Sequence, residues 1–366
     1  MKAFIFIVFL LTILSSCSND DKVDNPNLQD EIYFPPISGS AWETISAESL
    51  GWNVDQIPEL LNYLEINNTR AFIILKNGKI VIEEYWGDNF LGTSNFNQNT
   101  NWYWASAGKT ITATLTGIAQ QEGLLDINDK TSDYLGLGWT SLSIEKENLI
   151  TIKNQLSMTT GLDYEVDDLN CTLASCLLYK ADASLQWYYH NAPYTLLSDV
   201  ISEATQTNYN QYTDEKLESK IGMSGEWIRN GFNNMYWSTP RNMARFGLLM
   251  LNKGEWNETP VLADLNYFNA MTNTSQNLNP SYGYLWWLNG KNEVILPGFD
   301  FSINTQLADN APSDLVAGMG KNGQFVELLP SENIVVIRMG EAPDNSLVPI
   351  VFHNEMWAKI SAVIQD

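Results

Sequence analysis

The chain has 366 residues, of which 44% are hydrophobic and 17% charged, and its formal net charge is −23. This composition is typical of a globular protein that buries a sizeable core as one large domain or two lobes, and it excludes a mainly disordered chain. The excess of carboxylates argues against a nucleic-acid partner, because phosphate binding needs clustered lysine and arginine side chains.

The N-terminal segment 1–17 has the pattern of a secretory signal peptide. Lys2 precedes an apolar run, Phe4 to Leu14, that is too short for an ordinary membrane-spanning helix. The run ends in Leu14-Ser15-Ser16-Cys17, which resembles the bacterial lipobox and implies cleavage before Cys17 and lipid attachment to its thiol. The alternative is a plain secretory signal with an incidental cysteine. We expect an exported lipoprotein of the cell envelope, anchored to a bacterial membrane and facing the periplasm or the cell surface.

A polar segment without any apolar period follows the signal, as expected for a flexible tether. We place the tether at 18–48 and a single folded domain at 49–366. Within this domain, a sheet lobe is predicted for about 49–100 and 280–366, and a helical lobe for about 101–279.

In chain order, the first predicted elements are a helix over Val54–Asn67 and a β-hairpin over Ala71–Trp86. The hairpin has two apolar runs joined by Asn77-Gly78, which is the strongest short-range hairpin signal. A helix over Trp102–Gln121 follows, and Gly123 marks its end. Helical patterns then dominate as far as about residue 270. These further helices are predicted at Ile152–Met158, Tyr194–Thr205, Tyr209–Lys220 and Thr239–Leu251.

Strand-like composition returns in the last quarter of the chain. The predicted strands are Gly283–Leu288, Glu293–Leu296, Gly323–Leu329 and Asn333–Met339, and a terminal helix is predicted at Val348–Ile364. Strands at both ends with helices between them predict an α+β fold. We expect one antiparallel sheet built from N- and C-terminal segments and flanked by helices, with an inserted, mostly helical region.

Two cysteines, Cys171 and Cys176, lie outside the signal segment. Export would place them in an oxidising compartment, where a disulfide is permitted. In a continuous helix their separation would exceed ~7 Å along the axis, which is too far for a bridge without a bend. A local disulfide and a pair of buried thiols therefore both stay open.

The helix over Trp102–Gln121 carries Ser106 and Lys109 at its start, three residues apart and so on one face. One side of this helix is an apolar stripe, and the other is small and polar, so that a second element could pack closely over it and leave room for a substrate. The Ser-x-x-Lys spelling is weak by itself, because Ser143-Ile144-Glu145-Lys146 repeats it.

Two further signals distinguish Ser106. Tyr189-His190-Asn191 lies downstream, and Gly320-Lys321-Asn322-Gly323-Gln324 comes before a predicted strand. The three signals in this order resemble the serine hydrolases of the β-lactamase and penicillin-binding-protein superfamily, which use Ser-x-x-Lys, a Tyr-x-Asn or Ser-x-Asn element and a Gly-containing strand. The resemblance runs from about Gly51 to the C-terminus. In motif it is closest to class C β-lactamase-related carboxylesterases and 6-aminohexanoate-dimer hydrolases, and it implies a β-lactamase-like catalytic domain with an α/β/α sandwich.

The resemblance also implies roles for the matched residues. Ser106 would be the acylated nucleophile, Lys109 and Tyr189 the general acid/base residues, and Asn191 a group that orients the site and the substrate. The third element would bind substrate through Gly320, Lys321, Gly323 and Gln324. The backbone N–H groups of Ser106 and Lys321 are the expected oxyanion hole.

The requirements for a reactive serine also follow from chemistry alone, independently of the family resemblance. A serine hydroxyl is a poor nucleophile until a base takes its proton. A lysine can take it only if burial or its neighbours lower its pKa towards neutrality, and a tyrosine beside such a lysine can be held partly as phenolate. Because His190 and His353 are the only histidines, we expect neither a Ser-His-Asp hydrolase nor a His-rich zinc site.

We therefore predict a serine hydrolase that cleaves an ester or amide bond through an acyl-Ser106 intermediate. A small ester, amide or peptide substrate is expected, and neither a metal nor an organic cofactor. The alternatives are a penicillin-binding-type receptor or pseudoenzyme that binds cell-wall peptide without turnover, and a D-alanyl peptidase or β-lactamase. Lys321-Asn322-Gly323 departs from the Lys-Thr-Gly of β-lactamases, which argues against β-lactamase activity.

Overall fold

A computed structural model describes residues 31–364 of the chain. The predicted signal peptide, the lipidation site at Cys17 and the first part of the tether lie outside the described residues, so these stay predictions. Within residues 31–364, no helix is both long and apolar enough to cross a membrane.

The fold is built on a six-stranded antiparallel sheet with the strand order β2-β1-β11-β10-β9-β8. The strands are β1 Thr69–Lys76, β2 Lys79–Tyr85, β8 Trp287–Leu288, β9 Val316–Gly320, β10 Gln324–Leu329 and β11 Ile334–Gly340. Strand β1 pairs with β11, from Thr69 opposite Gly340 to Lys76 opposite Ile334. The N- and C-terminal segments therefore meet inside one sheet, which confirms the predicted α+β architecture.

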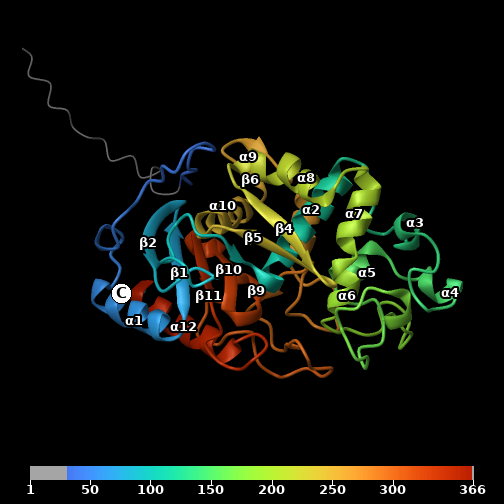
Figure 1. Ribbon diagram of the computed structural model, residues 1–366. Helices are drawn as coiled ribbons and strands as arrows, with labels where there is room; N and C mark the ends of the chain where they lie inside the picture. Colours follow the sequence, from blue (N-terminus) through green and yellow to red (C-terminus); the bar gives the residue numbers. More distant parts are fainter. Residues whose placement is uncertain (1–30, 365–366) are drawn as a thin grey trace, which may run out of the picture. The chain divides into compact units, whose positions relative to one another are not determined.

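Helices cover both faces of this sheet (Figure 1). Helices α1, Ile57–Ile66, and α12, Ile350–Ile364, lie side by side on one face, and α10, Pro240–Leu251, packs on the other. Strand β10 shows why both faces are covered, because its alternate side chains point to opposite sides. Phe325 contacts Phe352 of α12, whereas Val326 lies under Gly247 of α10.

The predicted hairpin is present, and it binds the C-terminal part of the predicted tether. Asn77 and Gly78 both have positive φ, 49° and 78°, as the hairpin turn requires. Tyr33 donates its backbone N–H to Asn77 O at 2.9 Å, and Thr44 forms a bridge with Ile80. The tether predicted for 18–48 is therefore too long at its C-terminal end, because residues from about 32 onward are held by the sheet.

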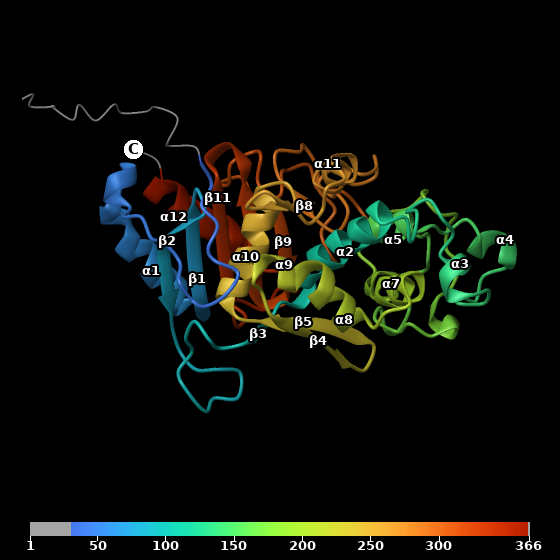
Figure 2. The same ribbon diagram turned by 90° about the horizontal axis from the view of Figure 1, so that it is seen from above.

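The remaining helices fill the region between β2 and β8. They are α2 Lys109–Gln121, α3 Ser132–Leu135, α4 Ile144–Glu147, α5 Ile152–Leu156, α6 Asn191–Thr195, α7 Leu197–Thr205, α8 Tyr209–Thr213, α9 Ser219–Ile221 and α11 Leu265–Met271. Figure 2 shows α3, α4, α5 and α7 gathered on the side away from α1 and α12. Helix α2 is buried on every side from Lys109 to Ala119, so its small polar face also packs against other elements.

Two predictions in this region and the following strands are wrong in part, and a third is confirmed with a local change. A second antiparallel sheet, β3 Trp102–Tyr103, β5 Asn233–Ser238 and β4 Gly225–Asn230, lies within the lobe predicted to be helical. The helix predicted for Tyr209–Lys220 is present, with a π-helical turn at Asp214–Glu218. Of the strands predicted at Gly283–Leu288 and Glu293–Leu296, only Trp287–Leu288 and a single bridge from Val294 to Ile303 form. A short pair, β6 Glu255–Trp256 and β7 Thr259–Pro260, completes the strands.

Candidate active site

Ser106 lies in a 3₁₀ turn, Ala105–Gly108, between strand β3 and helix α2. The predicted helix over Trp102–Gln121 therefore starts later than expected. Ala105 has a φ of 47°, in the left-handed region that non-glycine residues rarely adopt. Such local strain clusters at functional sites, where the surrounding structure holds it in place. Ala105 and the following Ser106 both line a cavity.

Lys109 is 3% exposed, and its ammonium group lies among neutral groups. Its Nζ lies 3.0 Å from Ser106 Oγ and donates to Asn191 Oδ1 at 3.0 Å. The rings of Tyr194 and Tyr189 are 4.1 and 5.0 Å away, measured to their centroids. Because burial removes water from the charged form, it lowers the pKa of Lys109 to about 7. A substantial fraction of the amine is therefore unprotonated and available as a base near neutral pH.

Tyr189 precedes α6 and packs flat against Trp287, with the two rings 5.7 Å apart and inclined by 20°. Burial raises the pKa of its phenol above the ordinary value, and an interaction with Ser106 opposes this only in part. This raised pKa argues against the expected partial phenolate. Tyr189 is a neutral hydroxyl that can both donate and accept a proton beside Ser106.

A cavity of about 370 Å³ opens in front of these groups. Ser106, Lys109, Tyr189 and Asn191 all line it, so the structure brings the first two predicted signals together. The other lining side chains are mainly apolar or amide-bearing. They include Leu169, Asn170, Tyr194, Asn233, Asn234, Met235, Pro297, Leu347 and Val348.

The predicted third signal reaches the same cavity through Lys321, and Gly320 lies against the turn that carries Ser106. A Cβ atom added to Gly320 would lie 2.6 Å from Trp104 O and 3.0 Å from Ser106 N. Only glycine therefore allows the end of β9 to lie against the turn that carries Ser106. Lys321 follows directly and lines the cavity. Its backbone N–H and that of Ser106 lie on neighbouring segments, as an oxyanion hole requires.

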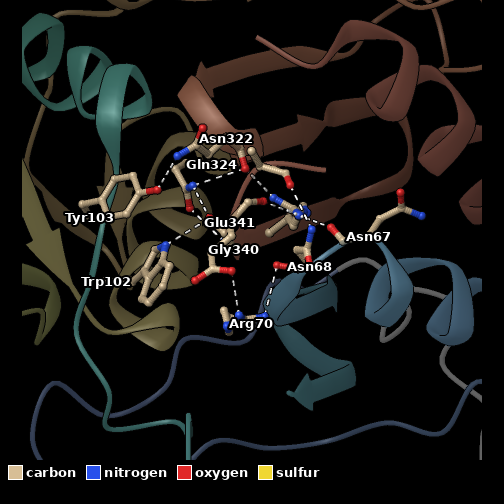
Figure 3. Close-up of polar contacts among 11 residues, drawn as sticks. Asn67, Asn68, Arg70, Trp102, Tyr103, Asn322, Gln324, Gly340 and Glu341 are labelled. Carbon is tan, nitrogen blue, oxygen red and sulfur yellow. Dashed lines mark hydrogen bonds and ion pairs between the residues drawn. The ribbon is translucent and has the colours of Figure 1, made fainter. Parts of the chain in front are cut away.

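Gly323 and Gln324 do not line this cavity, although substrate-binding roles are predicted for both. Gln324 is fully buried, and it donates to Gly340 O at 2.6 Å and accepts from Gly340 N at 3.0 Å (Figure 3). Gly323 has a φ of 74°, and a Cβ atom there would lie 2.6 Å from a guanidinium nitrogen of Arg338. Both residues support the turn after β9 on its side away from the cavity. The substrate-binding prediction for them is therefore wrong.

Arg338 holds this turn, and sequence reasoning missed it. All five of its N–H donors have an acceptor: the carbonyl oxygens of Asn67, Asn322, Gly323 and Glu341 and the hydroxyl of Thr69. Burial lowers its pKa to about 9. The sequence feature that could have pointed to Arg338 is its position as an arginine within the apolar run of β11. Asn322 also donates its amide to Tyr103 Oη at 2.7 Å, which ties the turn to the strand before Ser106 (Figure 3).

A disulfide joins Cys171 and Cys176, whose Cα atoms are 5.9 Å apart. Of the two alternatives for these cysteines, a local disulfide and a pair of buried thiols, the disulfide is therefore present. The chain between them is irregular except for a 3₁₀ turn at Ala174–Cys176, so no continuous helix separates the sulfur atoms. The neighbouring Asn170 lines the cavity, and the sequence contains no motif that marks it.

A model of the beta-lactamase family matches residues 69–345. The chain belongs to this family. It is 26% identical over 225 residues to a putative penicillin-binding protein, PbpX, of Bacillus subtilis (strain 168), a match that covers 58% of this chain and only 53% of that protein. An uncharacterized protein of Alkalihalophilus pseudofirmus is 24% identical over 323 residues, which cover 80% of this chain and 88% of that protein.

Solved structures of the beta-lactamase type share the fold. A putative 6-aminohexanoate-dimer hydrolase from Bacillus anthracis has a TM-score of 0.67 at 17% identity, over 90% of this chain and 89% of that one. A penicillin-binding protein homolog from Caulobacter crescentus has a TM-score of 0.64 at 12% identity, over 84% and 97% of the two chains. The family and the fold place the chain among serine hydrolases of this superfamily.

Proposed function

We propose that this protein hydrolyses an ester or amide bond through an acyl-Ser106 intermediate. The observation that carries the proposal is the 3.0 Å separation of Ser106 Oγ from a buried Lys109 amine whose pKa is about 7. A base at hydrogen-bond distance with a pKa near the working pH is what a serine nucleophile needs.

In acylation, the neutral Lys109 amine takes the Ser106 proton as Oγ attacks the substrate carbonyl. The negative charge that develops on the carbonyl oxygen is stabilised by the backbone N–H groups of Ser106 and Lys321. The proton then passes to the leaving group, either from Lys109 or through the Tyr189 hydroxyl, and the bond to the leaving group breaks. In deacylation, a water molecule loses its proton to the same pair and attacks the acyl carbon, and Ser106 Oγ recovers a proton.

The lining of the cavity favours an acyl group that has apolar surface and carries no positive charge. Leu169, Met235 and Val348 supply apolar surface, and no acidic residue is among the described residues that line the cavity. The names of the structural neighbours, a putative 6-aminohexanoate-dimer hydrolase and a penicillin-binding protein homolog, support amide or ester substrates as the class to test first.

A substrate panel tests the proposal. The pure protein is incubated with a fluorophosphonate probe, a short p-nitrophenyl ester and a chromogenic cephalosporin, alongside Ser106→Ala. We expect probe labelling and ester turnover that are both lost in Ser106→Ala. Ester turnover that survives the substitution contradicts the assignment of Ser106, and stable labelling without turnover favours a receptor over an enzyme.

The activity should rise with pH through about 7. Burial lowers the pKa of Lys109 to about 7, so the amine is protonated and inactive as a base below this value and neutral above it. A pH profile of kcat/KM for the ester measures this limb directly. A profile that is flat between pH 5.5 and 8.5 would show that Lys109 is not the base.

A further inference from the structure

A line of hydrogen bonds leads from Lys109 to the surface of the protein. Lys109 Nζ donates to Asn191 Oδ1 at 3.0 Å, and Asn191 Nδ2 donates to Asn170 Oδ1 at 3.0 Å. Asn170 Nδ2 in turn donates to Asp168 Oδ1 at 2.9 Å. The line therefore ends on the carboxylate of Asp168, which is exposed.

The carboxylate sets the direction of every bond in this line. An ionised carboxylate only accepts hydrogen bonds, whereas an asparagine amide has one accepting and one donating end and can be turned by half a rotation. Asp168 must therefore face the NH₂ end of Asn170, which leaves the oxygen of Asn170 for the NH₂ end of Asn191. The oxygen of Asn191 is then the end that faces Lys109.

This direction matters for the reactive amine. A neutral lysine amine has two N–H groups and one lone pair. When an N–H group binds the oxygen of Asn191, the lone pair stays available for the Ser106 hydroxyl, which lies 3.0 Å away. If Asn191 were reversed, its NH₂ group would donate to that lone pair and compete with Ser106. The other titratable groups that face the amine are the phenols of Tyr189 and Tyr194, so no second carboxylate fixes its orientation among the described contacts.

We propose that Asp168 and Asn170 are positioning residues that, through Asn191, keep the lone pair of Lys109 directed at Ser106. The inference rests on the proposed function. Backbone contacts hold the loop that carries Asp168 and Asn170 in the position that these hydrogen bonds require. Asp168 Oδ1 also accepts from the backbone N–H of Asn170 at 2.9 Å, and Leu169 O accepts from Ala192 N at 2.9 Å. The disulfide begins at the next residue, Cys171.

Three variants test the proposal by kcat and KM for the p-nitrophenyl ester and by the rate of fluorophosphonate labelling. Asp168→Ala lets Asn170 and then Asn191 reverse, and we expect kcat to fall about fivefold, which corresponds to the loss of one hydrogen bond. KM should stay unchanged, because Asp168 is not among the residues that line the cavity. Asp168→Asn keeps an accepting oxygen, held in place by the backbone N–H of Asn170, and should retain activity within about twofold.

The deciding variant is the double substitution Asp168→Ala with Asn170→Asp. A carboxylate at position 170 accepts directly from Asn191 Nδ2 and needs no partner at 168, so kcat measured at a pH above the pKa of Lys109 should exceed that of Asp168→Ala. A defect caused only by the lost turn at Asp168 would not be rescued in this way, because the double variant lacks that turn too.

The outcomes separate the two proposals. If the wild-type protein is neither labelled nor active, or if Ser106→Ala keeps the activity, the proposed function fails and the inference fails with it. If the wild type reacts through Ser106 but Asp168→Ala matches it, or if the double variant is no faster than Asp168→Ala, the positioning role alone is overturned. Melting temperatures within about 2 °C of the wild type show that the variants are folded.

Discussion

Lys109→Met is expected to lower kcat/KM for ester hydrolysis about a thousandfold, within the range that a general base contributes. Methionine fills the buried space of the lysine side chain but has no amine to take the Ser106 proton. Lys109→Arg should be equally inactive, because a guanidinium group stays protonated. The two variants together show whether the site needs a neutral amine or only a positive charge. Steady-state kinetics and the rate of probe labelling measure both.

The chain contains a matched control for this prediction in its second Ser-x-x-Lys sequence. Ser143 precedes helix α4 on the surface, and Lys146 forms an ion pair with Asp182 at 2.6 Å, away from the cavity. Lys146→Met should therefore leave kcat/KM within about twofold of the wild type. More than a tenth of the wild-type activity in Lys109→Met, or an equal loss in Lys146→Met, would contradict the assignment of Lys109.

Arg338→Met is expected to lower the free energy of unfolding by about 3–5 kcal/mol, since each buried acceptor that loses its donor costs about 1–3 kcal/mol and water can replace only some of them. The substitution leaves the carbonyl oxygens of Asn322 and Gly323 without the guanidinium that now binds them at 2.8 Å. The turn before β10 loses its anchor, so ester turnover should fall as well. Urea unfolding followed by tryptophan fluorescence measures the stability.

Arg229 is a suitable control for the loss of an arginine. Its side chain is 51% exposed and forms a 3.1 Å ion pair with Asp199, whose side chain is 43% exposed. Such surface pairs contribute about 0–1 kcal/mol. Arg229→Met should therefore change the free energy of unfolding by less than about 1 kcal/mol. Equal destabilisation by the two substitutions would show that the five hydrogen bonds of Arg338 carry no particular weight.

Sequence patterns predicted the main sheet because its signals are local. Asn77-Gly78 needs positive φ at both positions, and the apolar run at Gln324–Leu329 is a strand with both faces buried. The hairpin of β4 and β5, whose strands are joined by Gly231-Phe232, was missed because the surrounding helical patterns dominated the interpretation.

The candidate site was predictable where its residues belong to spaced motifs. Ser106, Lys109, Tyr189 and Asn191 lie around one cavity, as their order along the chain indicated. Asn170 was not predictable, because its importance comes from a contact with Asn191 across 21 residues of chain. Gln324 was misjudged for a related reason. Its motif placed it near the site, but only the packing of Gly340 shows that its side chain faces the interior.

The pairing of β1 with β11 also determines when an active molecule can arise. Strand β1 is made early in synthesis, yet its partner is formed by Ile334–Gly340, more than 250 residues later. Pairings of such long sequence separation form late, because the intervening chain must first be brought together. A nascent or truncated chain that stops before Ile334 lacks both this central strand and Arg338. The wall of the cavity at Lys321 can therefore become ordered only after translation has passed this strand. Incomplete chains should consequently have no hydrolytic activity.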